Sequence, residues 1–158
     1  MSKFYSHPNK LYTTHITNML DKDDSLLEHS VKLYHDIAKL KSTFQQYITT
    51  LDESVKNKNH TLLSGYIFLL NSEFSFKELL FGALAIFSHH SALFNLLTLK
   101  EDNIYIGENF SSSKELEFLE EVVEAANSLD LYQNLKSNKE LLEKKSKRAK
   151  KIFKKSLF

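Results

Sequence analysis

The sequence predicts an all-α protein, and three observations support this fold class. The 158 residues include three glycines and one proline, which leaves few positions for the tight turns of β-hairpins. Leu, Lys, Glu and Ser dominate, and apolar residues recur every three or four positions along most of the chain. Because a chain of this length suits one domain of ordinary size, we expect a single hydrophobic core.

Composition narrows the chemistry that the chain can carry out. There is no cysteine, so disulfides and thiolate metal sites are excluded, and a metal ion must be held by His, Asp and Glu. The amino-terminal sequence MSKFYSHPNK lacks the apolar segment of a signal peptide. No run approaches the roughly 18 to 20 apolar residues that span a bilayer. We therefore expect a soluble, cytoplasmic protein.

Charge divides the chain into two parts. Residues 1–135 carry 11 Lys and 18 Asp or Glu, a net charge of −7. Residues 136–158 carry ten Lys or Arg and two Glu, a net charge of +8. We expect a folded domain at 1–135 and a basic carboxy-terminal helix or tail at 136–158. The basic segment suits contact with nucleic acid, or it is a solvated helix, or it packs on the acidic body.

The first half of the chain is expected to hold two helices after an irregular lead-in at residues 1–9. Four residues share the inward face of the first helix: Leu11, His15, Ile16 and Met19. The acidic stretch at 21–25 suits a loop that ends in a helix cap. The second helix is expected at about 26–51, with an apolar stripe at Leu27, Val31, Tyr34, Ile37, Ala38, Phe44, Tyr47 and Ile48.

The remaining elements follow from polar loops and capping residues. A surface loop is expected at 52–59, and His60 then starts or caps a third helix through Leu70. Ser75, with Glu78 three residues later, forms a capping box for a fourth helix that ends at His89 and His90. An extended connector is expected at 102–107, followed by helices at about 113–128 and 138–157.

Seven histidines occur, and five of them lie inside or beside apolar helical runs, where an unpaired ring is costly. A single histidine on such a face is usually a hydrogen-bonded core residue. Five that converge on one carboxylate favour a metal site instead. In the stretch LYHDIAK, the His35 imidazole can bind one metal ion, and the two oxygens of Asp36 can bridge to a second ion. Lys39 can pair with Asp36 or contact a phosphate oxygen, or it is a solvated lysine.

Imidazoles and a carboxylate around two metal ions suit phosphoester hydrolysis. Such a site lowers the pKa of bound water and holds the attacking and leaving oxygens of a phosphodiester. Acyl transfer is disfavoured, because there is no cysteine and no serine in a Gly-rich strand-to-helix turn.

Several motifs occur in a recognisable order: His15 in LYTTHI, LYHDIAK, FQQY at 44–47, NHTLLSG with His60 and Ser64, and AIFSHHSAL. Over residues 4–97 this order resembles the HD nuclease domain of the CRISPR-associated helicase-nuclease of type I systems. The resemblance implies an HD-domain helical bundle that cuts single-stranded DNA in antiviral CRISPR interference. It also implies a helicase domain or subunit and an RNA-guided surveillance complex as partners.

The resemblance also implies the metal ligands. His15, His35 and Asp36 would hold one divalent ion, while Asp36, His60, His89 and His90 would hold the second, with Asp36 as the bridge. Mn, Ni, Co, Fe and Mg are the candidate ions. Asp36 and Lys39 are the candidate catalytic residues. His29 matches no ligand position, and we do not expect His7 to be a ligand.

One part of the family pattern is missing. The family completes its first metal site with a downstream aspartate in a helix that reads like SLLxxADx, and no such motif follows residue 91. Asp102 and Asp130 are the candidate substitutes. There is also no GxxxxGK[ST] phosphate-binding loop. The chain is thus a fragment, a subunit whose helicase is a separate chain, or a divergent member with one well-formed metal site.

Two other functions remain open. One is an HD phosphohydrolase that acts on nucleotides or cyclic dinucleotides, although the FQQY and HxxxS motifs favour the nuclease. The other is a catalytically incomplete HD module that binds DNA or a partner chain, which the missing aspartate favours.

Overall fold

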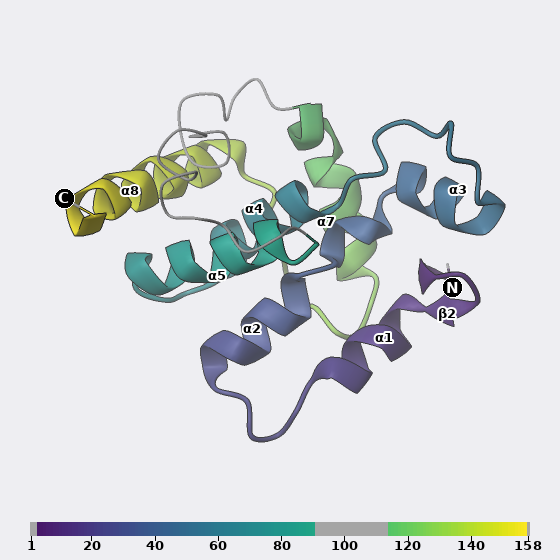
Figure 1. Ribbon diagram of the computed structural model, residues 1–158, viewed down its shortest axis with the longest axis horizontal. Helices are drawn as coiled ribbons and strands as arrows, with labels where there is room; N and C mark the ends of the chain where they lie inside the picture. Colours follow the sequence, from purple (N-terminus) through teal and green to yellow (C-terminus); the bar gives the residue numbers. More distant parts are fainter. Residues whose placement is uncertain (1–2, 91–113, 158) are drawn as a thin grey trace.

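The computed structural model describes residues 3–90 and 114–157, and it confirms an all-α fold (Figure 1). Within the described ranges the helical elements are α1 Tyr12–Met19, α2 Leu26–Tyr34, η1 Ile37–Leu40, α3 Ser42–Thr50, α4 Thr61–Asn71, α5 Phe76–Ser88, η3 Lys114–Phe118, α7 Leu119–Asn127 and α8 Lys139–Leu157. A short hairpin, β1 Tyr5–His7 and β2 Lys10–Leu11, precedes them. None of the described helices has the length and apolar character needed to cross a membrane.

Helix α4 lies at the centre of the hydrophobic core. Every residue from Leu63 to Leu70 is buried, because α4 packs against α5, α2, α8 and η1. Helix α8 runs beside α5 (Figure 1), and its Leu142 is fully buried. The two helices α4 and α5 approach closely at Gly65 and at Gly82, where a phenylalanine ring from the other helix occupies the space of a side chain.

The amino-terminal segment differs from the irregular lead-in that we predicted. Tyr5 to Leu11 form an antiparallel hairpin whose turn contains Asn9 at a φ of 60°. The Gln45 side chain in α3 accepts a hydrogen bond from the Tyr5 amide and donates one to the Tyr5 carbonyl, each at 2.8 Å. This pairing across 40 residues fixes the strand, so local sequence could not reveal it. Leu11 therefore lies in β2 and is exposed, not on the inward face of a helix.

The single helix predicted at 26–51 is also wrong, because the chain breaks after Tyr34 into α2, η1 and α3. Asp36 has φ −114° and ψ 9°, which ends the α-helical geometry. Beyond the break the Ala38 amide donates to the Ser64 hydroxyl oxygen at 3.0 Å instead of to a carbonyl of its own helix. The hydroxyl of α4 thus replaces a helical hydrogen bond, and the break lies at the His35-Asp36 pair.

The other predicted boundaries agree with the structure where it describes them. Ser25 and Ser75 both form capping boxes, with Glu28 and Glu78 respectively. His60 is the N-cap residue of α4, although its side chain does not cap the helix. The helix predicted at about 113–128 is η3 followed by α7. The connector predicted at 102–107 lies outside the described residues.

A buried ion pair joins η3 to the start of α3. The side chain of Lys41 is fully buried and donates to the Asn59 carbonyl and, at 3.0 Å, to Glu115 Oε2.

We predict that Glu115→Gln lowers the free energy of unfolding by about 3 kcal/mol, because it leaves a buried ammonium without its charge partner. Urea unfolding measures this loss. The double variant Lys41→Met/Glu115→Gln should lose less, and an equal or larger loss in the double variant would contradict the prediction.

Candidate metal centre

Five of the six candidate ligands lie where helices begin, end or break. His35 is the C-cap residue of α2, and Asp36 follows it at the break. His60 precedes α4, while His89 and His90 follow α5. His15 alone comes from a helix interior, in α1. The structure brings them into two groups that share Asp36: His15, His35 and Asp36 in one, and Asp36, His60, His89 and His90 in the other.

Asp36, a residue that is only 2% exposed, places its carboxylate at the centre of this cluster. Its Oδ1 lies 3.1 Å from Nε2 of His60 and 3.1 Å from Nε2 of His89. Nε2 of His90 lies 3.1 Å from Nε2 of His60. The second oxygen, Oδ2, lies 3.0 Å from Nε2 of His15, 3.3 Å from Nε2 of His35 and 2.8 Å from Nζ of Lys39.

Backbone contacts determine which nitrogen of two rings carries the proton. Nδ1 of His35 lies 2.6 Å from the Lys32 carbonyl oxygen, and Nδ1 of His89 lies 2.6 Å from the Ile86 carbonyl oxygen. Because a carbonyl only accepts, each Nδ1 must donate a proton. In the neutral rings Nε2 then presents a lone pair toward the Asp36 carboxylate. Two electron-rich atoms face each other stably only when a cation lies between them.

Protonation states in the cluster also suit a metal ion. Burial by itself would raise the pKa of Asp36, but the imidazoles of His35, His60 and His89 around its oxygens lower it below its usual range. Burial lowers the pKa of His60 to about 4, against the opposing attraction of Asp36. At neutral pH the cluster thus combines an ionised carboxylate with a neutral imidazole, the forms in which these groups bind metals.

The donor spacing fits a divalent ion. Two atoms about 2.1 Å from one ion and at right angles lie about 3.0 Å apart. The 3.1 Å separations of Oδ1 from Nε2 of His60 and of His89, and of Nε2 of His60 from Nε2 of His90, match this spacing. Nitrogen and carboxylate donors suit Mn, Fe, Co, Ni and Zn better than Ca. The described residues therefore form a histidine-aspartate cluster that could hold a metal ion.

The other residues considered from the sequence lie apart from these groups or cannot be placed. His29 is exposed on α2, and the exposed His7 ring lies edge-on to the His15 ring with centroids 4.9 Å apart. Asp130 is exposed and belongs to neither metal group, and Asp102 is outside the described residues. Lys39 is buried, so its interpretation as a solvated lysine is wrong.

Sequence reasoning missed the residues that position the break. The Tyr132 hydroxyl donates to the Leu33 carbonyl at 2.6 Å, and the Tyr12 hydroxyl lies 2.6 Å from the Tyr132 hydroxyl. Gln45 Nε2 donates to the Lys39 carbonyl at 2.7 Å. The sequence marks FQQY only as part of a motif, and no local pattern marks Tyr132, which lies 99 residues from Leu33.

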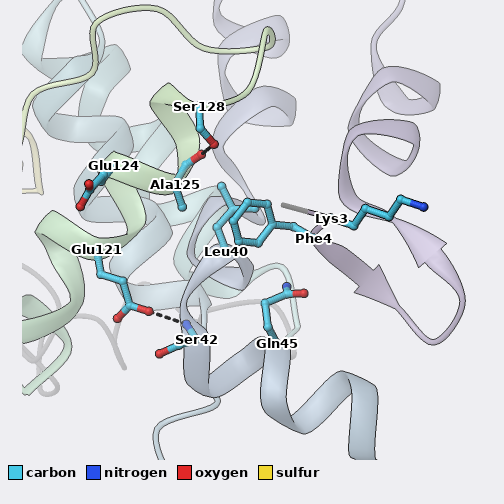
Figure 2. A pocket seen from close by; sticks show the side chains of 9 residues that line it. All are labelled: Lys3, Phe4, Leu40, Ser42, Gln45, Glu121, Glu124, Ala125 and Ser128. Carbon is cyan, nitrogen blue, oxygen red and sulfur yellow. Dashed lines mark hydrogen bonds between the residues drawn. The ribbon is translucent and has the colours of Figure 1, made fainter. Parts of the chain in front are cut away.

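A separate pocket of about 540 Å³ lies between the amino-terminal segment, the start of α3 and α7. Figure 2 shows Phe4 and Leu40 side by side in its wall, and Glu121 accepting a hydrogen bond from the Ser42 amide. None of the candidate metal ligands lines this pocket. The histidine-aspartate cluster is therefore the stronger candidate site.

Fold and site together define the class: an all-α protein with a histidine-aspartate cluster suited to a divalent metal. No protein-family model matches this sequence, and the curated proteins and solved structures yield no similar protein.

The lowered pKa of His60 predicts that the metal-free protein loses stability in acid. A histidine in the unfolded chain titrates near pH 6.5, whereas folded His60 titrates at about 4. Between these values the unfolded chain binds a proton that folded His60 does not. The free energy of unfolding should therefore fall by roughly 2–3 kcal/mol from pH 7 to pH 4.5.

Urea unfolding at several pH values tests this effect. His60→Gln removes the titrating ring, so its pH dependence should be flatter than that of the wild type. His29→Gln, which changes an exposed histidine outside the cluster, should follow the wild-type curve. Parallel curves for the wild type and His60→Gln would contradict the assignment.

Proposed function

We propose that this chain is a metal-dependent nuclease that hydrolyses phosphodiester bonds of single-stranded DNA in CRISPR interference. The observation that supports this proposal most directly is the contact of Nδ1 of His35 and of His89 with a backbone carbonyl, which in the neutral rings leaves an Nε2 lone pair facing the Asp36 carboxylate. The order of motifs from LYTTHI to AIFSHHSAL supports the choice of reaction and substrate. A metal site alone would be compatible with many hydrolases.

In this proposal the residues of the cluster have different roles. His60, His89, His90 and Asp36 Oδ1 hold one divalent ion, and His15, His35 and Asp36 Oδ2 provide the ligands for a second. Divalent metal ions at such a site make water more acidic and neutralise charge on the phosphate. Asp36 orients both ligand groups, and the Lys39 ammonium holds Oδ2 and provides positive charge close to the substrate phosphate.

The cluster is reachable by a substrate on the side of the paired histidines. His90 is exposed, and the His89 side chain is 20% exposed, whereas the side chains of His15 and His35 are 13% and 11% exposed. We name the two sets of ligands after the Asp36 oxygen that each contains: the Oδ1 group has His60, His89 and His90, and the Oδ2 group has His15 and His35. A phosphate that approaches from solvent would meet the Oδ1 group first. The exposed Lys144, Arg148 and Lys151 on α8 would contact phosphates farther along the strand, since Arg148 lies over Phe76 at the opposite end of α5 from His89. A helicase and an RNA-guided surveillance complex would deliver that strand.

Cleavage assays with the metal-free full-length chain test the proposal. After reloading with Mn, Co or Ni, the protein should cut a labelled single-stranded oligonucleotide and lose this activity on chelation. Duplex DNA should be cut more slowly. Release of phosphate from small nucleotides without cutting of the oligonucleotide would support an HD phosphohydrolase and contradict the proposal.

A catalytically incomplete HD module is the second candidate function. It is favoured by one observation: in the described ranges, no second carboxylate joins His15 and His35 in their group. Such a module would bind single-stranded DNA and leave it intact with every metal tested. That result, with a correctly folded protein, would replace the nuclease proposal by a binding function.

A further inference from the structure

The two oxygens of Asp36 have different surroundings. Oδ2 lies 2.8 Å from the Lys39 ammonium, which is a full positive charge inside the cluster. The described partners of Oδ1 are only the Nε2 atoms of His60 and His89. One side of the carboxylate is thus already neutralised by a side chain, and the other side is not.

Lys39 is held at this position by several contacts. Its side chain is 4% exposed, its amide donates to the Asp36 carbonyl at 2.9 Å, and its carbonyl accepts from Gln45. The Nζ atom lies 5.6 Å from the centre of the Phe44 ring, within the range of a cation-π interaction. Moving the ammonium away from Oδ2 would therefore break a packed arrangement.

The histidines on the two sides of Asp36 also differ in how many of their contacts can be made without a metal ion. On the Oδ2 side, His15 can donate from Nε2 to Oδ2 at 3.0 Å, which requires no metal ion. The neutral His35 ring faces Oδ2 at 3.3 Å without a proton on Nε2, because its Nδ1 donates to the Lys32 carbonyl. On the other side, the neutral His89 ring has no proton on Nε2, because its Nδ1 donates to the Ile86 carbonyl. Nε2 of His60 lies 3.1 Å from both Oδ1 and Nε2 of His90, and its single proton can serve only one of them. The Oδ1 group therefore has two contacts that lack a proton and no ammonium beside it, whereas the Oδ2 group has one such contact and the Lys39 ammonium.

We propose that the Lys39 ammonium supplies positive charge to the Oδ2 group in place of a metal ion. The chain then binds its first divalent ion through His60, His89, His90 and Asp36 Oδ1. A second ion at His15, His35 and Oδ2 binds more weakly, because it must approach the Lys39 ammonium and gains no second carboxylate. This inference rests on the metal-binding role in the proposed function, and it makes that role unequal between the two ligand groups.

Metal titration of the full-length chain tests the inference without reference to catalysis. Calorimetric titration with Mn²⁺ or Co²⁺ should show one tight ion in the wild type and a second ion at least about tenfold weaker. Lys39→Met removes the charge and keeps an apolar chain of similar length, so it should tighten the second ion at least about tenfold. Lys39→Arg keeps the charge and should behave like the wild type.

Two ligand variants identify the tight site. His60→Ala should remove the tight ion, whereas His15→Ala should leave it. Equal affinity for two ions in the wild type, an unchanged second ion in Lys39→Met, or loss of the tight ion in His15→Ala would each overturn the inference. A chain that binds ions in this unequal way but leaves DNA intact would contradict the nuclease proposal alone.

Discussion

Asp36→Asn is expected to weaken binding of the first divalent ion by at least about 100-fold, since loss of a mere supporting residue of a metal site already costs 10- to 100-fold. The amide removes the negative charge on which both ligand groups converge. Its NH₂ group can also donate hydrogen bonds to the histidine Nε2 lone pairs, which then no longer need a cation. DNA cleavage should fall with metal occupancy. Calorimetric titration and a single-turnover cleavage assay measure the two effects.

A matched variant separates this effect from a general loss of stability. Asp24 also forms an ion pair with a lysine, 2.6 Å from Lys32 Nζ, but it lies in the loop before α2. Asp24→Asn should keep wild-type metal affinity and cleavage. Circular dichroism confirms that each variant remains helical. Wild-type metal affinity in folded Asp36→Asn would show that the cluster is not a metal site.

Gly65→Ala is expected to destabilise the protein by about 2 kcal/mol, although alanine normally favours a helix over glycine by about 1 kcal/mol. A Cβ atom at this position of α4 would overlap the ring of Phe87 in α5. The ring or the helix must therefore move. Phe87 lies two residues before His89, so the displacement should also weaken metal binding. Thermal unfolding and metal titration measure both consequences.

Two comparisons test the steric cause. Phe87→Leu combined with Gly65→Ala should recover part of the lost stability, with a coupling of about 1 kcal/mol. Gly82→Ala produces the same kind of overlap with the Phe68 ring, which is not beside a candidate ligand. It should lower stability and leave metal affinity unchanged. Additive effects of Gly65→Ala and Phe87→Leu would contradict the argument.

The sequence predicted which histidines lie together because its evidence is chemical and local. Imidazoles inside apolar runs are costly unless they are satisfied, and their number favoured convergence on Asp36. The structure brings His15, His35, His60, His89 and His90 around that carboxylate. Helix starts were equally predictable at Ser25 and Ser75, because a capping box is completed within four residues.

The features that sequence reasoning missed depend on contacts between distant residues. Periodicity continued through His35 and Asp36, so it predicted one helix where the structure has a break. That break is completed by Ser64, 26 residues from Ala38, and by Tyr132, 99 residues from Leu33. The amino-terminal hairpin likewise depends on Gln45. A pattern of neighbouring residues cannot show which distant hydroxyl or amide will replace a backbone partner.

The sequence by itself determined the all-α class, the capped helix starts and the kinds of donor available to a metal ion. Tertiary structure decided which nitrogen of His35 and His89 faces Asp36, and on which oxygen the Lys39 ammonium lies. Capping and periodicity arise from groups within one or two helical turns. Ring orientation and burial of a charge depend on how separate helices pack, so they exist only in the folded chain.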